Sequence, residues 1–241
     1  ENAIFTYDKQ TFELTTISSV QGLSGDTISA LIYIENSNLL VIGFENGLIQ
    51  VLNENTKDVL NVVDILDKQT ILPDKKRIND FILFNNTVYI SADFGISEYN
   101  INQLEFGDTF FIGDNGTQLS INEIAVFDGF FYAATESGIR RALTSNPNLI
   151  DFQEWQTLSN GIWEGIASVG ARLYAAANNQ RVFEVIGLNV FEREFFSNPI
   201  LDLYTINNQL AVTTIDVSNI YTETYQPIIS IPSSSYNNTN F

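Results

Sequence analysis

The side chains that could bind a partner directly lie in two places. Lys75, Lys76 and Arg77 form a basic run that follows a proline in an otherwise acidic chain. Ammonium and guanidinium groups donate charge-assisted hydrogen bonds, so this run could bind an anionic glycan or an acidic patch on a protein. The alternative, a solvated loop with incidental charges, stays open. Trp155 lies in a polar loop, where its ring could stack on a sugar or enter an interface pocket.

Oxygen-bearing side chains gather at Asp108, Asp114 and Asn115, and oxygen ligands are what Ca²⁺ requires. Their spacing departs from the alternating pattern of a calcium loop. Asp114 and Asn115, with the glycine that follows, are more simply a turn. Arg140 and Arg141 occupy a predicted strand, and we expect at least one of them to pair with a carboxylate. We therefore predict no metal site and no cofactor.

The composition excludes several classes of function. The chain has no His and no Cys, which removes Ser-His-Asp catalysis, His-ligated zinc and disulfides. The formal net charge of −18 repels phosphate backbones, so we expect no nucleic-acid partner. No apolar run is long enough to form a transmembrane segment. Hydrophobic residues make up 44% of the chain, which is ample for a folded core.

The chain is built from a repeat. Five stretches align with one another, and each has apolar residues at its first, fourth and seventh positions; the stretches begin at Ile28, Ile78, Ile121, Trp163 and Ile200. A second strand follows in each stretch, with small residues close behind its first apolar position. The turns between the two strands are rich in Asn, Asp and Gly, which tolerate the positive φ of tight hairpins. Trp163 belongs to the first apolar column, so we expect it in the core.

The second strands recur every 37 to 49 residues. This period, with β-branched and aromatic strands, is typical of β-propeller blades of four strands. We therefore predict an all-β fold: a single propeller domain over residues 1–241, with blades starting near 28, 78, 121, 163 and 200. The segment around Ile4 matches the third strand of a blade, residues 226–231 could be a fourth strand, and residues 233–241 could begin another blade. With part-blades at both ends, the full ring would hold about six or seven blades and need not be complete in this segment.

Residues 22–48 (GLSGDTISALIYIENSNLLVIGFENGL) resemble the two-component-regulator propeller repeat. Three further stretches resemble the N-terminal propeller of the PorZ-like proteins of the Bacteroidetes type IX secretion system: GFENGLIQ at 43–50, DKKRIND at 74–80, and LEFGDTFFIG at 104–113 followed by FYAATESGI at 131–139. The resemblance extends from Phe5 to about Tyr221.

This resemblance implies a non-enzymatic binding scaffold at the cell surface or in the periplasm, associated with the outer membrane. Its expected partners are the proteins of an attachment complex, namely a sortase-like peptidase and β-barrel proteins, with lipopolysaccharide or another glycan as a further ligand. The resemblance transfers no particular binding residue to this chain.

Two other functions stay open. The first is the periplasmic, oligosaccharide-binding sensor propeller of a hybrid two-component system, because the repeat is common to both families. The second is a propeller enzyme such as a polysaccharide lyase or hydrolase, which would have to work without His. No carboxylate pair stands out, so we expect no enzyme.

Overall fold

The computed structural model describes residues 2–232. These residues fall into two compact units, which meet in sequence between Thr109 and Phe110. The strands that begin in the first unit are β1 (Ile4–Tyr7), β2 (Leu14–Ile17), β3 (Ile28–Ile34), β4 (Leu39–Phe44), β5 (Ile49–Asn53), β6 (Val59–Val62), β7 (Ile78–Phe84), β8 (Thr87–Ala92), β9 (Gly95–Asn100) and β10 (Glu105–Phe110). Its helical turns are η1 (Ser19–Gln21), η2 (Glu35–Ser37), α1 (Asp64–Asp67) and η3 (Pro73–Lys75).

The second unit is also built from strands. They are β11 (Ile121–Phe127), β12 (Phe130–Thr135), β13 (Gly138–Leu143), β14 (Gln156–Ser159), β15 (Trp163–Val169), β16 (Arg172–Ala177), β17 (Arg181–Ile186), β18 (Asn189–Phe195), β19 (Ile200–Ile206), β20 (Gln209–Thr214), β21 (Val217–Tyr221) and β22 (Pro227–Pro232). Two short turns, η4 (Asp114–Gly116) and η5 (Phe152–Glu154), complete it. No helix among residues 2–232 has both the length and the apolar character that crossing a membrane requires.

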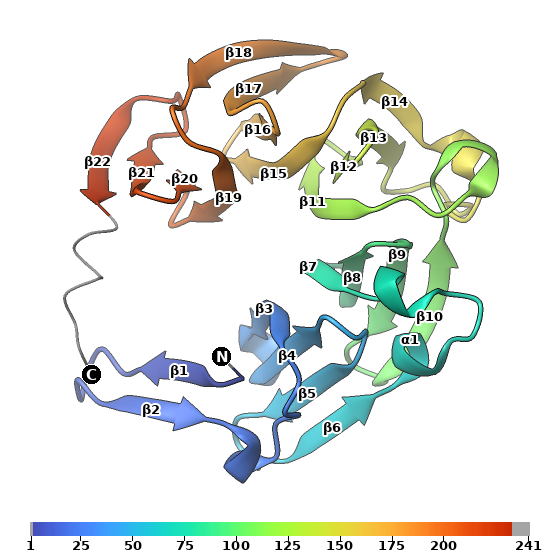
Figure 1. Cartoon of the computed structure of the whole chain (residues 1–241), viewed down its shortest axis with the longest axis vertical. Helices are drawn as coiled ribbons and strands as arrows, with labels where there is room; N and C mark the ends of the chain where they lie inside the picture. The colour runs from blue at the N-terminus through green and yellow to red at the C-terminus, as the bar shows by residue number, and fades with distance from the viewer. Residues whose placement is uncertain (1, 233–241) are drawn as a thin grey trace. The chain divides into compact units, whose positions relative to one another are not determined.

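The fold is an all-β propeller of four-stranded blades, each blade being four consecutive antiparallel strands (Figure 1). Residues 2–232 form five such blades, which begin at β3, β7, β11, β15 and β19. The sequence predicted six or seven blades for the full ring and allowed for an incomplete ring in this segment. The N-terminal part-blade is confirmed as the two-stranded sheet β1–β2, and β22 is the predicted fourth strand. The further blade predicted to begin at residues 233–241 lies outside the described residues.

Three of the five predicted hairpin turns have positive φ at both turn residues, as expected of tight two-residue hairpins. Asn85 and Asn86 both have positive φ, as do Asp128 with Gly129 and Asn207 with Asn208. Two consecutive residues of positive φ give a turn whose twist matches that of the flanking strands. These turns explain why short polar pairs separate the first and second strands of the blades.

The second strands of the blades are well enclosed, as their small residues predict. All six residues of β4 are buried, and at Gly43 an added Cβ would lie 2.6 Å from Cγ2 of Ile78 on β7. Neighbouring blades therefore approach too closely at this point for any side chain.

A β-bulge recurs near the start of the first strand of every blade. The register shifts fall between Ile28 and Ala30, Ile78 and Asp80, Ile121 and Glu123, Trp163 and Gly165, and Ile200 and Asp202. In the second unit, the Glu123 carboxylate accepts a 2.8 Å hydrogen bond from the backbone N–H of Ile166, on the next blade. The bulge thus sets a side chain where it can join two blades.

The core is a set of apolar layers between sheets. In the first unit, Ile4 of the part-blade packs with buried residues of the next blade, which are Leu23, Leu40, Ile42, Phe44, Leu48 and Leu52. In the second unit, one layer lies between the β11 and β15 blades and another between the β15 and β19 blades. Burial of these layers supplies the main favourable term in folding.

Candidate functional site

The basic run does not act as one surface patch. Lys76 is 7% exposed and donates a hydrogen bond to the carbonyl of Leu66. Lys75 is half-buried at the end of η3, and Arg77 forms a 2.9 Å ion pair with Glu45, in which both side chains are about half exposed. Lys75 and Arg77 are therefore the members of the run that a partner could reach.

Trp155 is 4% exposed, so its ring lies in the core and not at a surface. The indole N–H donates a 2.9 Å hydrogen bond to the carbonyl of Leu149, and the ring stacks against Phe131 with centroids 6.5 Å apart. Stacking on a sugar would require the ring to leave this pocket. Trp163 is buried as predicted, with its edge toward the ring of Phe183.

The turn interpretation of Asp114 and Asn115 is confirmed. They lie in η4, where Asn115 has a φ of 61°, and Asp114 accepts a 2.9 Å hydrogen bond from the Arg140 guanidinium. Arg140 is thus the arginine that pairs with a carboxylate, while Arg141 lies 4.7 Å from the ring centroid of Phe130. Within residues 2–232, no group of three or more acidic side chains is placed to hold a metal ion.

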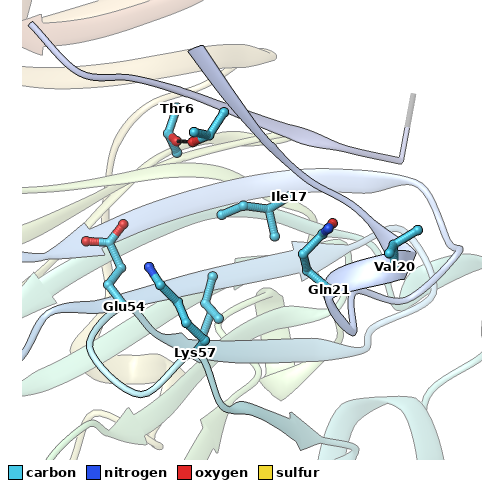
Figure 2. Close-up of a pocket in the computed structure, with 8 residues that line it drawn as sticks. Thr6, Ile17, Val20, Gln21, Glu54 and Lys57 are labelled. Carbon is cyan, nitrogen blue, oxygen red and sulfur yellow. Dashed lines mark hydrogen bonds between the residues drawn. The ribbon is translucent and has the colours of Figure 1, made fainter. Parts of the chain in front are cut away.

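A cavity of about 580 Å³ lies in the first unit, between the β1–β2 hairpin and the end of β5 (Figure 2). The residues that line it are Thr6, Thr15, Ile17, Val20, Gln21, Leu52, Glu54 and Lys57. Sequence reasoning did not identify this cavity, because its walls come from three segments that are not adjacent in the chain.

The β1–β2 hairpin forms one wall of the cavity. Its register pairs Thr6 with Thr15 and Ile4 with Ile17, so these four side chains share one face of the sheet. The two threonine hydroxyls hydrogen-bond to each other across the strands. Ile17 packs against the buried layer that contains Leu52, and these two residues give the cavity an apolar floor.

The turn η1 holds Gln21 in a fixed orientation. The Gln21 side-chain carbonyl accepts hydrogen bonds from the Ser18 N–H (2.9 Å) and the Ser18 hydroxyl (3.0 Å), which together with the cap from Ser18 form a capping box. The amide NH₂ of Gln21 has no hydrogen-bond partner among residues 2–232. Gln21 therefore presents a preorganised donor at one end of the cavity.

A rigid turn places two charges at the other end. The Asn53 side chain accepts hydrogen bonds from the N–H groups of Asn55 (2.9 Å) and Thr56 (3.2 Å), and the N–H of Lys57 donates to the Asn53 carbonyl at 2.8 Å. Lys57 itself has a φ of 65°. Figure 2 shows Glu54 and Lys57 on one side of Ile17 and Gln21 on the other.

The two charges differ in their surroundings. The Glu54 carboxylate raises the pKa of the nearby Tyr33 hydroxyl, which itself donates a 3.2 Å hydrogen bond to the Asn38 side chain. The Lys57 ammonium has no ion pair or side-chain hydrogen bond within the described part of the chain. The cavity thus combines an apolar floor with a free cation, a carboxylate and an amide donor. This arrangement is suited to binding a ligand of moderate size.

No curated protein matches the sequence. Among solved structures, PorZ of Porphyromonas gingivalis superposes with a TM-score of 0.78 at 19% identity, covering 96% of this chain and 30% of PorZ. BamB of Moraxella catarrhalis superposes at 0.59 with 14% identity, covering 96% of this chain and 82% of BamB.

The designed protein Ika8 gives a TM-score of 0.60 at 15% identity, covering 96% of this chain and 71% of Ika8. Because these three structures share less than 20% of their residues with this chain, their structural similarity supports the propeller fold alone. The chain spans less than a third of the length of PorZ. A family model described as "TSS9, PorZ, N-terminal beta-propeller domain" matches residues 1–156, more than half of the sequence. The chain therefore belongs to the family of PorZ N-terminal β-propeller domains.

Proposed function

We propose that this chain is a non-enzymatic binding domain of the type IX secretion system, acting at the outer membrane in the attachment of cargo proteins to the cell surface. The family match over residues 1–156 carries this proposal. PorZ of P. gingivalis is described as an essential bacterial surface component of that system.

The proposed partners are proteins of the attachment complex, a sortase-like peptidase and β-barrel proteins among them. Within each compact unit, apolar layers hold neighbouring blades together, and in the second unit a link from Glu123 to Ile166 does so as well, so loops can present contacts to a partner from a packed framework. With no His, the chain also lacks the side chain that most often acts as general base near neutral pH.

A pull-down from detergent-solubilised outer membranes tests the partners, with the tagged 241-residue chain and the tagged full-length protein as parallel baits. We expect both baits to recover a sortase-like peptidase and a β-barrel protein, identified by mass spectrometry. Recovery with the full-length bait alone would place the contact outside this domain. Absence from both would contradict the proposal and favour the sensor alternative.

The glycan ligand is a separate part of the proposal and now rests on Lys75 and Arg77. Purified lipopolysaccharide is the probe, and binding is measured by biolayer interferometry with the 241-residue chain. We expect the double variant Lys75→Gln/Arg77→Gln to bind more weakly than Lys9→Gln/Arg181→Gln, which removes the same charge elsewhere and also breaks one partly exposed ion pair. Equal binding of lipopolysaccharide by the two double variants would show that the basic run is not part of the glycan-binding site.

A further inference from the structure

We propose that the cavity between the β1–β2 hairpin and the β5 turn binds the C-terminal end of a peptide whose last residue is aliphatic. The proposal stands on the geometry of this cavity and does not depend on the role in secretion.

The carboxylate of such a peptide is recognised by Lys57. The backbone of Lys57 is fixed by the turn after β5, and its exposed ammonium, which has no ion pair within residues 2–232, can donate charge-assisted hydrogen bonds to an anionic group of the ligand. Glu54 lies on the same side of the cavity (Figure 2), but within residues 2–232 it forms no ion pair with Lys57, so no carboxylate is in direct contact with this ammonium. The carboxylate of Glu54 lies beside Tyr33 instead.

The remaining groups match the atoms next to a peptide C-terminus. The apolar floor of Ile17 and Leu52 accepts the last side chain, whose burial is favourable. Glu54 can accept the last peptide N–H. At the far end the Gln21 NH₂ can donate to a preceding carbonyl, because its own carbonyl is fixed by Ser18. Along the cavity, the ammonium, the carboxylate, the apolar floor and the amide donor thus match the carboxylate, the last N–H, the last side chain and a preceding carbonyl of an extended peptide.

The size of the cavity favours a peptide over a single amino acid. At about 580 Å³ it lies well within the range that holds ligands of several residues' size. A free aliphatic amino acid would leave the Gln21 end to water.

The test uses an N-terminally fluorescein-labelled pentapeptide, Gly-Ser-Gly-Val-Leu, with a free carboxylate, and its C-terminally amidated twin. Fluorescence anisotropy measures the binding of both to the 241-residue chain. We expect the free acid to bind about tenfold more tightly than the amide, the effect of one charge-assisted hydrogen bond. Lys57→Gln should lower the affinity for the acid to that for the amide and leave the amide unchanged.

Two variants serve as controls. Lys9→Gln removes an exposed charge that does not line the cavity, and this variant should bind both peptides as the wild type does. Thr15→Trp fills the cavity from an exposed position and should abolish binding of both peptides, with an unchanged far-UV circular dichroism spectrum. Equal affinities for acid and amide would overturn the proposal, as would competition by free leucine at the same concentration as the pentapeptide, or no saturable binding up to about 1 mM peptide.

Discussion

Glu98 on β9 faces Tyr89 on β8, and its carboxyl group is partly buried. Burial raises the pKa of Glu98, the charge of Asp108 raises it further, and the hydrogen bond from the Tyr89 hydroxyl opposes the shift. The folded protein therefore holds this proton at pH values where the unfolded chain has released it.

This shift predicts a change in stability with pH. Because the pKa of Glu98 is raised on folding, its contribution to the free energy of unfolding is largest below its ordinary value of 4.5 and falls as the pH rises through the folded pKa. In Glu98→Gln this fall should be absent. Urea unfolding followed by fluorescence, at a series of pH values from about 4 to 7, measures the difference between wild type and variant.

Glu105→Gln provides the matched control, because Glu105 is exposed on the neighbouring strand β10. Its stability profile should run parallel to that of the wild type. A Glu98→Gln profile that also runs parallel would contradict the assignment of the shift to Glu98.

Single residues were the hardest features to predict from the sequence. The basic run could be found by inspection, but the burial of Lys76 depends on the carbonyl of Leu66, ten residues away. Trp155 is enclosed by Phe131 and Leu149 in the same way. In the cavity, the spacing of Ser18 and Gln21 does show a capping box, yet nothing local indicates that Lys57 lies across from it.

At the scale of strands and turns, the sequence was far more informative. The Asn, Asp and Gly pairs predicted the hairpins because few other residues adopt two successive positive φ angles. The bulges were not predicted, although the sequence contains a signal for them. Ile121 and Ile124 lie on the same face of the sheet but are three residues apart. In a regular strand, residues on one face are separated by an even number of positions, so the odd spacing indicates an inserted residue.

The close approach of blades at Gly43 gives a prediction for this scale. In Gly43→Ala the new Cβ would meet Cγ2 of Ile78 at 2.6 Å and Cζ of Phe81 at 2.9 Å. We expect the free energy of unfolding to fall by about 1–3 kcal/mol, as is usual for an overpacked core. Gly25→Ala is the control, because no atom lies within 4 Å of its Cβ position. Equal urea midpoints for the two variants would show that the blades can separate there without cost.

For the whole molecule, the boundary between the two compact units is informative. It falls at residues 109 and 110, inside β10 (Glu105–Phe110), which is hydrogen-bonded to β9. Independent domains are usually joined by exposed linkers and not by a strand of a sheet. We therefore propose that residues 1–241 unfold as a single domain.

The positions of the tryptophans make this testable. Both tryptophans of the chain, Trp155 and Trp163, lie in the second unit, so fluorescence excited at the indole band reports on that unit. Far-UV circular dichroism reports on both units. Coincident urea transitions by the two probes are expected for one cooperative domain, whereas separated transitions would show that the units unfold independently.

The order of strands within each blade has a consequence for synthesis. Every four-stranded blade among residues 2–232 consists of strands that follow one another directly in the chain. A blade can therefore pair all its strands as soon as its own residues have left the ribosome, since none of them waits for a distant segment. Within a unit, the apolar layer with the next blade forms only one repeat later, so a nascent unit buries its apolar surface blade by blade. This stepwise order would limit the apolar surface that is open to aggregation during synthesis.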